Sequence, residues 1–123
     1  MGKTIIMTAS VLLAMAVGIG AFGAHGLKSQ ISGEMLQIYK TGVEYHFYHA
    51  LGLLLIGVLA VAVPSLSLKW PFILFVVGII LFSGSLYLLA VTGLKVLGAI
   101  TPFGGLSFIA GWILLFFTVW KNL

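Results

Sequence analysis

The sequence contains no cysteine, no aspartate and no arginine, and charged side chains of any kind are few. Without cysteine there can be no disulfide, no thiolate metal ligand and no cysteine nucleophile. Without aspartate there can be no Ser-His-Asp triad. Only 7% of the residues are charged, whereas about 25% is usual in soluble domains. So few charges cannot cover the surface of a soluble protein of 123 residues.

The charges that are present do not form a patch. The net charge is +4, and the lysines stand singly near the ends of apolar stretches. Isolated lysines at such places are typical of side chains that reach from apolar surface to lipid head groups. A nucleic-acid-binding protein would instead gather its basic residues on one face. We therefore expect membrane lipids as partners and no nucleic acid. The lysines are Lys3, Lys28, Lys40, Lys69, Lys95 and Lys121.

Long apolar stretches dominate the rest of the chain, whose hydrophobic content is 62%. Each has about 20 residues and no charge inside, the length that crosses a bilayer as a helix. Helices and closed barrels alone satisfy their own backbone in lipid, and uninterrupted apolar stretches are not strands of a barrel. An alternative for the first stretch is a cleaved signal peptide, but its apolar part exceeds the usual length. We expect one transmembrane domain, residues 1–123, with helices at about 4–24, 45–63, 71–92 and 102–120.

The segment between the first two stretches has a helical pattern of its own. Its apolar residues recur at helical spacing, and most of its polar residues fall between them. This pattern predicts a short amphipathic helix lying on the membrane surface. A solvated loop is the alternative. The apolar positions are Leu27, Ile31, Met35, Ile38 and Tyr39.

Small residues occur in all the predicted spans. Lipid provides no hydrophobic drive between helices, so close packing at small residues must hold them together. The predicted fold class is therefore all-α, an integral membrane four-helix bundle with the interfacial helix between helices one and two. The predicted packing glycines are Gly18, Gly20, Gly23, Gly57, Gly84, Gly104, Gly105 and Gly111.

Ionisable residues within or beside the spans are candidates for function. His25 ends the first span, and the segment from Glu44 to His49 begins the second, so antiparallel helices would bring them to one membrane face. Tyr45 and His49 are four residues apart and share a side of the helix. The hydroxyl of Tyr87, on the third span, is expected to reach His49. His46 lies on the same helix, three residues before His49.

This polar cluster has several interpretations. His25, His49 and Glu44 offer ligands for a metal ion, and two histidines on neighbouring helices could hold haem. A carboxylate with imidazoles could relay protons. Polar ties between helices are the simplest interpretation. Trp112, inside the fourth span, needs an acceptor for its indole N–H, and we expect a serine or a carbonyl.

Ordered motifs along the chain resemble a known family. They look like the signature of the bacterial membrane protein family numbered 423 among the domains of unknown function, whose animal relatives include transmembrane protein 256. The resemblance implies an inner-membrane protein of four spans and brings no established activity. It favours cytoplasmic termini, which places His25, Glu44 and His49 on the outer face; the basic residues alone divide equally between the two sides. The motifs lie in residues 20–25, 41–49, 81–87 and 101–112.

No catalytic residue set and no cofactor are predicted from these patterns. The leading hypothesis is a small non-enzymatic multi-pass membrane protein that forms a homo-oligomer and supports membrane integrity or a membrane partner. One alternative is a small transporter or channel, although the midplane residues are nearly all apolar. The other alternative is a metal- or haem-binding membrane protein that uses the histidine and glutamate cluster.

Overall fold

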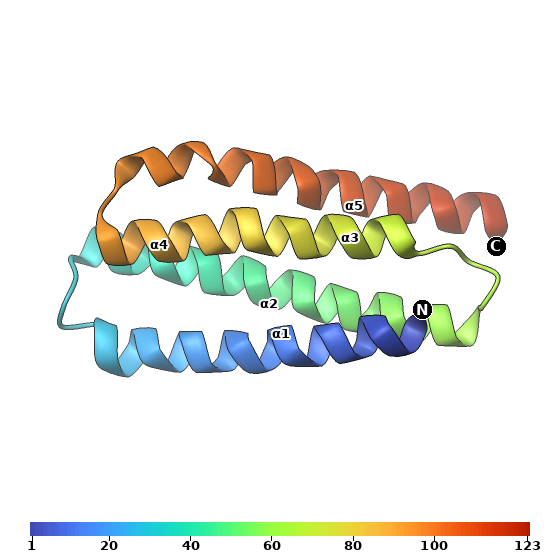
Figure 1. Cartoon of the computed structure of the whole chain (residues 1–123), viewed down its shortest axis with the longest axis horizontal. Coiled ribbons are helices and arrows are strands. Elements are labelled where there is room, and N and C mark those ends of the chain that lie inside the picture. The colour runs from blue at the N-terminus through green and yellow to red at the C-terminus, as the bar shows by residue number, and fades with distance from the viewer.

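Helices make up almost the whole chain in the computed structural model, which describes residues 1–123 and contains no strand (Figure 1). Helical segments follow one another with little interruption and form four spans, each long and apolar enough to cross a membrane. This confirms the predicted all-α, four-helix class. The elements are α1 (Gly2–Phe22), the π-helical turn η1 (Gly23–Leu27), α2 (Gly33–Ala62), α3 (Lys69–Gly78), the π-helical turn η2 (Ile79–Ser83), α4 (Gly84–Thr92), the 3₁₀ turn η3 (Lys95–Ala99) and α5 (Thr101–Asn122).

The spans alternate in direction, so both termini lie at the same end of the bundle (Figure 1). Prolines mark the changes of direction. Pro64 follows the end of α2, and Pro71 and Pro102 lie in the first turns of α3 and α5. Proline in a first turn loses no intrahelical hydrogen bond, because the N–H groups there have no partner in the helix.

The second span corrects one prediction. A separate interfacial helix is absent, because α2 runs without a break from Gly33 to Ala62. The segment before Tyr45 is helical, as its pattern predicts, but nothing in it ends the helix. No proline occurs before Pro64, and Gly42 is tolerated inside the helix. The side chain of Ser32 caps the start by accepting from the N–H of Met35 at 3.1 Å.

The length of α2 has a consequence for the membrane boundary. At about 1.5 Å per residue, its 30 residues exceed the roughly 30 Å of a hydrocarbon core. The apolar part begins at Tyr45. We therefore expect the residues from Gly33 to Glu44 to extend into the head-group region.

The helices pack as neighbours in an ordered series. α1 packs along α2, α4 packs against α2, and α3 packs against α5, with η2 touching both α2 and α5. A core of apolar side chains joins all four spans, from Ile5 on α1 to Phe75 on α3 and Phe108 on α5. α1 contacts little besides α2, and its far side is exposed.

The predicted packing glycines fall into two groups. A methyl group at Gly57 would lie 2.6 Å from Ile6 of α1, and one at Gly111 would lie 2.6 Å from Phe75 of α3, so both allow close approach. Gly20, Gly23 and Gly104 also lie at helix contacts. A methyl group at Gly18 or Gly84 would meet nothing within 4 Å, and one at Gly105 would only touch the ring of Phe82 at 3.8 Å.

Candidate functional site

Two histidines of α2 lie inside the bundle. His46 is 1% exposed and His49 is 5% exposed, although an imidazole is costly to bury without partners. They are three residues apart and share one side of α2, which also carries Gly42, Ala50 and Leu53 to the interior. This side faces α4 and α5, so the histidines meet the later spans.

His49 is held by a hydrogen bond at each ring nitrogen. Its Nδ1 lies 2.8 Å from the carbonyl oxygen of Tyr45, one turn earlier. The indole Nε1–H of Trp112 on α5 donates to His49 Nε2 at 3.0 Å. An indole nitrogen can only donate, so Nε2 accepts and the proton of the neutral ring is on Nδ1. The imidazole therefore ties α2 to α5.

Aromatic rings surround this imidazole. Phe108 of α5 stacks on His49 with centroids 3.5 Å apart and an interplanar angle of 9°. Phe75 of α3 approaches edge-on at 5.3 Å, and the ring of Tyr45 is stacked at 6.2 Å. Sequence reasoning missed the ring partners of His49 on α3 and α5. The spacing of Phe108 and Trp112, four residues apart like Tyr45 and His49, was the available signal.

His46 is the partner of Tyr87. Its Nδ1 lies 2.8 Å from the hydroxyl of Tyr87 on α4. The expected contact of Tyr87 with His49 is therefore wrong. His49 is one turn further along α2 and faces α5, whereas His46 faces α4. The buried His46 Nε2 makes no hydrogen bond of normal geometry.

Serine hydroxyls form further hydrogen bonds between the second, third and fourth spans. Ser83 donates to the carbonyl of Gly42 at 2.7 Å, and Ser107 donates to the carbonyl of Leu74 at 2.6 Å. Ser85 and Thr101 share a hydrogen bond of 2.6 Å. Each bond crosses from one helix to another, so the buried hydroxyls link spans two, three and four.

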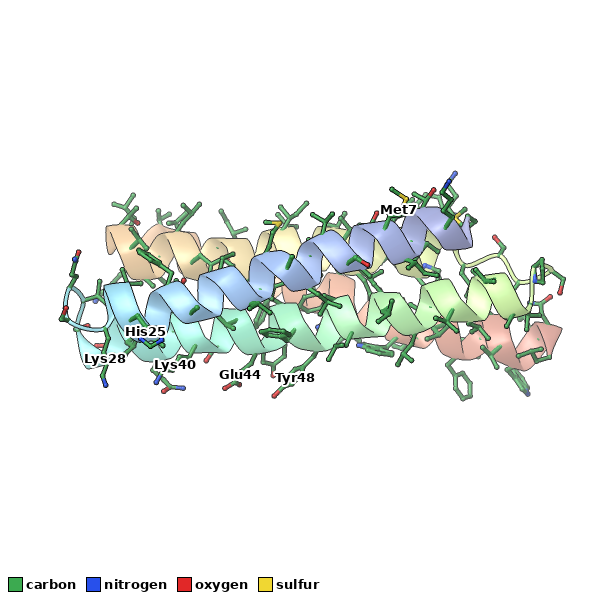
Figure 2. All side chains as sticks on the ribbon, turned by 90° about the horizontal axis from the view of Figure 1, so that it is seen from below. Met7, His25, Lys28, Lys40, Glu44 and Tyr48 are labelled. Carbon is green, nitrogen blue, oxygen red and sulfur yellow. The ribbon has the colours of Figure 1, made fainter.

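The remaining members of the predicted cluster lie outside the bundle. His25 and Glu44 are both exposed, and Figure 2 shows Glu44 projecting from one edge of the bundle. Tyr45 is 39% exposed. His49 is instead buried against α5, so the predicted metal set of His25, Glu44 and His49 is not brought together. No three histidines or carboxylates lie close enough to hold a metal ion.

A groove opens beside the buried imidazole, between α2 and α5. It has a volume of about 370 Å³ and is lined almost entirely by rings, with Gly105 leaving space in its wall. The lining supplies aromatic faces and no charged group. Such a surface can take apolar acyl chains or rings, and both nitrogens of its imidazole are already hydrogen-bonded within the protein. The ring-bearing residues are Tyr45, His49, Phe82, Phe108 and Trp112.

The fold and the site together define a small multi-pass membrane protein whose buried polar groups join its helices. The chain belongs to the family described as "Protein of unknown function (DUF423)", which matches residues 19–105. This confirms the resemblance drawn from the sequence motifs.

Curated relatives agree with this assignment. The chain is 48% identical over 114 residues to UPF0382 membrane protein YwdK of Bacillus subtilis, covering 92% of this chain and 93% of the relative. It is 44% identical over 119 residues to a UPF0382 membrane protein of Staphylococcus haemolyticus, covering 97% of each. A UPF0382 membrane protein of Staphylococcus aureus strain USA300 is 48% identical over 119 residues, again covering 97% of each. No solved structure matches the chain.

Proposed function

We propose that this membrane protein is non-enzymatic and acts through packing, as a small homo-oligomer that supports membrane integrity or a membrane partner. The observation that carries the proposal is how the buried polar groups are used. Apart from His46 Nε2, each buried polar side-chain atom is hydrogen-bonded within the protein. Both carboxylates, Glu34 and Glu44, are exposed and leave the imidazoles without an acidic partner.

Transport is the weaker alternative because no polar path crosses the bundle. The largest buried core, which extends from Ile5 and Ala9 on α1 to Phe108 on α5, consists of apolar side chains alone. An ion would meet only hydrocarbon there, which is costly to cross. We expect proteoliposomes that contain the protein to show the same ion flux as empty liposomes. Protein-dependent flux that rises with the amount of protein would contradict the proposal.

The oligomer is supported by the two rows of small residues on α1. One row, with Ala16, Gly20 and Gly23, faces α2. The other row, with Ala14 and Gly18, is exposed, and a methyl group at Gly18 would meet nothing within 4 Å. Glycine in an exposed helix costs about 1 kcal/mol relative to alanine. A second helix backbone close to Gly18 would offset this cost.

Cysteine crosslinking in lipid tests the oligomer, because the chain has no cysteine of its own. Ala14→Cys places a thiol on the free row, and Met15→Cys places one about 100° round the helix as the matched control. We expect oxidative dimers from Ala14→Cys and few from Met15→Cys. Monomer alone, or equal dimer yields from both variants, would count against this interface.

We further propose the bacterial plasma membrane as the location, with cytoplasmic termini. The membrane class of the relatives supports the location. Single cysteines in place of Lys28 and Lys121 test the orientation, because both lysines are exposed at opposite ends of the bundle. An impermeant thiol reagent on intact cells should label Lys28→Cys and spare Lys121→Cys. The reverse pattern would place the termini outside.

A further inference from the structure

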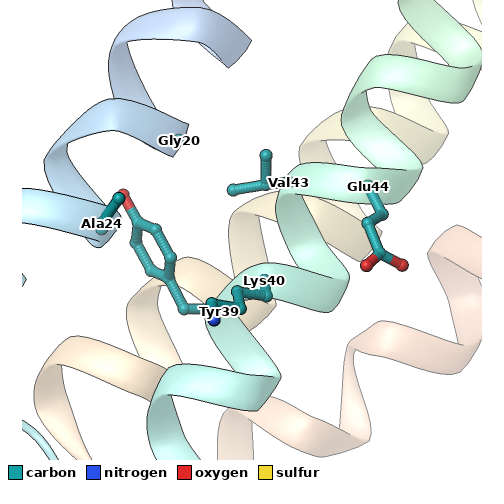
Figure 3. A pocket seen from close by; sticks show the side chains of 7 residues that line it. Gly20, Ala24, Tyr39, Lys40, Val43 and Glu44 are labelled. Atoms are coloured by element: carbon teal, nitrogen blue, oxygen red, sulfur yellow. The ribbon is translucent and has the colours of Figure 1, made fainter. Parts of the chain in front are cut away.

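The groove between α2 and α5 has the size of a ligand site. Its volume of about 370 Å³ falls within the range of about 300–1,000 Å³ in which proteins bind small molecules. A hollow between α1 and α2 is smaller, at about 170 Å³. The ring of Tyr39 extends from α2 to α1 within that hollow, and the Glu44 carboxylate points away from α1 (Figure 3). The groove beside α5 is therefore the better candidate for a ligand.

The lining of the groove favours a flat ring over a hydrocarbon chain. Five of its seven residues carry rings, and these come from α2, η2 and α5. The ring centroids of Tyr45 and Phe82 are 4.7 Å apart, and those of Phe82 and Phe108 are 5.6 Å apart. A ligand ring that stacks on such a wall gains affinity beyond the burial of apolar area, and an aliphatic chain does not.

Gly105 also indicates a ligand in the groove. It lies in the wall that α5 contributes, and a methyl group there would touch only the ring of Phe82, at 3.8 Å. The packing of the helices therefore does not require glycine at this position, whereas it does at Gly104. Glycine inside a helix lowers stability relative to alanine, and the close approach of a ligand to the backbone is one reason for its presence.

One polar group of the lining is available to a ligand. Both nitrogens of His49 and the indole N–H of Trp112 are already hydrogen-bonded within the protein. The remaining polar group is the hydroxyl of Tyr45, whose side chain is 39% exposed. A phenol hydroxyl can donate to a carbonyl oxygen. No charged side chain lines the groove, so a charged ligand would be costly to bury and a neutral one is expected.

A second apolar groove adjoins the first. Its volume is about 510 Å³, and five residues of α5 from Trp112 to Trp120 line it. Trp112 belongs to both grooves. The first groove lies near the membrane boundary, because Tyr45 begins the apolar part of α2, and the second runs toward the end of the bundle that holds the C-terminus (Figure 1). Together they suit a molecule with a polar ring at the boundary and an apolar tail in the membrane interior.

We propose that the two grooves bind an isoprenoid quinone. The quinone ring stacks on the aromatic lining of the first groove, and one ring carbonyl accepts a hydrogen bond from the hydroxyl of Tyr45. The tail lies along α5 from Trp112 to Trp120. A quinone is neutral and flat and carries acceptor oxygens on its ring, as the lining requires. A phospholipid instead has a charged head group, for which the lining offers no partner.

Quenching of tryptophan fluorescence tests the proposal on the full-length protein. Trp70→Phe combined with Trp120→Phe leaves Trp112 as the only emitter, since the chain has three tryptophans. The probe is a naphthoquinone with a short isoprenoid tail, added to phosphatidylcholine nanodiscs, because a quinone quenches an indole on contact. We expect quenching that saturates as the ratio of quinone to lipid rises. Squalene, which has an isoprenoid chain and no ring, should not reverse the quenching.

Two pairs of variants in this background locate the bound ring. Tyr45→Phe removes only the hydroxyl, so the quinone ratio at half saturation should rise about fivefold, as expected for one hydrogen bond. Tyr48→Phe is its control, because Tyr48 is exposed and lies outside the groove. Gly105→Leu fills the groove and should abolish saturation. Gly84→Leu is its control, because a methyl group at Gly84 would meet nothing within 4 Å, and it should behave as the parent.

Several results would overturn the proposal. They are quenching that rises without saturation, saturation retained in Gly105→Leu, an unchanged half-saturation ratio in Tyr45→Phe, or reversal by squalene, which would make the groove a site for chains. Tyr45→Phe changes a partly exposed side chain by one atom, so it tests the proposal even if Gly105→Leu does not fold. The proposed oligomer uses an exposed row of α1, which lines neither groove, so either proposal can fail while the other holds.

Discussion

Gly104 and Gly105 are neighbours in the sequence, yet the structure predicts opposite effects when each is changed to alanine. A methyl group at Gly104 would lie 2.7 Å from the Cα of Phe82, so it would collide with the backbone of η2. A methyl group at Gly105 would meet only the ring of Phe82, at 3.8 Å. The first contact cannot relax by rotating a side chain, whereas the second is an ordinary van der Waals contact.

The size of the difference follows from two opposing terms. Overpacking a close contact costs about 1–3 kcal/mol, and backbone contacts belong at the upper end. Replacing glycine by alanine inside a helix gains about 0.5–1 kcal/mol. Gly104→Ala should therefore destabilise the protein by about 1–2 kcal/mol. Gly105→Ala should leave it unchanged or stabilise it by up to about 1 kcal/mol.

Thermal unfolding in a mild detergent, followed by circular dichroism, measures both variants under the same conditions. Gly84→Ala is a useful third variant, because a methyl group there would meet nothing within 4 Å. We expect its midpoint to equal or exceed that of wild type. If Gly104→Ala and Gly105→Ala unfold at the same temperature, the close approach of α5 to η2 is wrong.

The hydrogen bonds of the buried site give further predictions. Trp112→Phe keeps a ring beside His49 but removes the N–H that donates to the imidazole, so it should lower the stability by about 1 kcal/mol. Thermal unfolding measures this loss, and an unchanged midpoint would show that the hydrogen bond contributes nothing. Tyr87→Phe should lower the stability by a similar amount. A double-mutant cycle with His46→Ala should show that the two changes are coupled, and additive effects would contradict the contact between Tyr87 and His46. Ser107→Ala removes a bond to a carbonyl of α3 and should lower the midpoint less than Gly104→Ala does; a larger loss would mean that the hydroxyl has another role.

Much of the architecture follows from composition and length. Apolar stretches of about 20 residues leave few options in lipid, and the prolines beside them mark where the helices turn. The boundary of the second span did not follow in this way. The amphipathic pattern after Leu27 suits both a helix lying on the membrane and the emerging end of a longer helix. Only the absence of a break before Tyr45 distinguishes them, and a glycine at position 42 does not stop a helix.

The site was only partly predictable for a similar reason. Helical periodicity places His46 and His49 on one side of α2, but it cannot say which later helix each will meet. That choice depends on the rotation of α4 and α5 about their own axes. His46 contacts Tyr87, and His49 contacts Trp112, whose predicted acceptor was a serine or a carbonyl. The acceptor of the indole is instead an imidazole nitrogen.

His25 and Glu44 illustrate the limit of reasoning from topology. Antiparallel spans place His25 and Glu44 toward the same end of the bundle, and Figure 2 shows both there. Sharing an end does not bring side chains into contact, because each helix has an inner and an outer side. His25 and Glu44 are on outer sides, and His49 is on an inner one.

The π-helical turn η2 makes the third span sensitive to its exact length. Such a turn accommodates one extra residue, which rotates the following helix by about 100° relative to an uninterrupted α-helix. α3 can therefore pack against α5 while α4 packs against α2. Deleting one residue between Ile79 and Ser83 would turn Tyr87 away from His46, whereas the exposed connection from Lys28 to Gln30 has no such constraint. Insertions and deletions should accordingly be tolerated in that connection and excluded from the middle of the span.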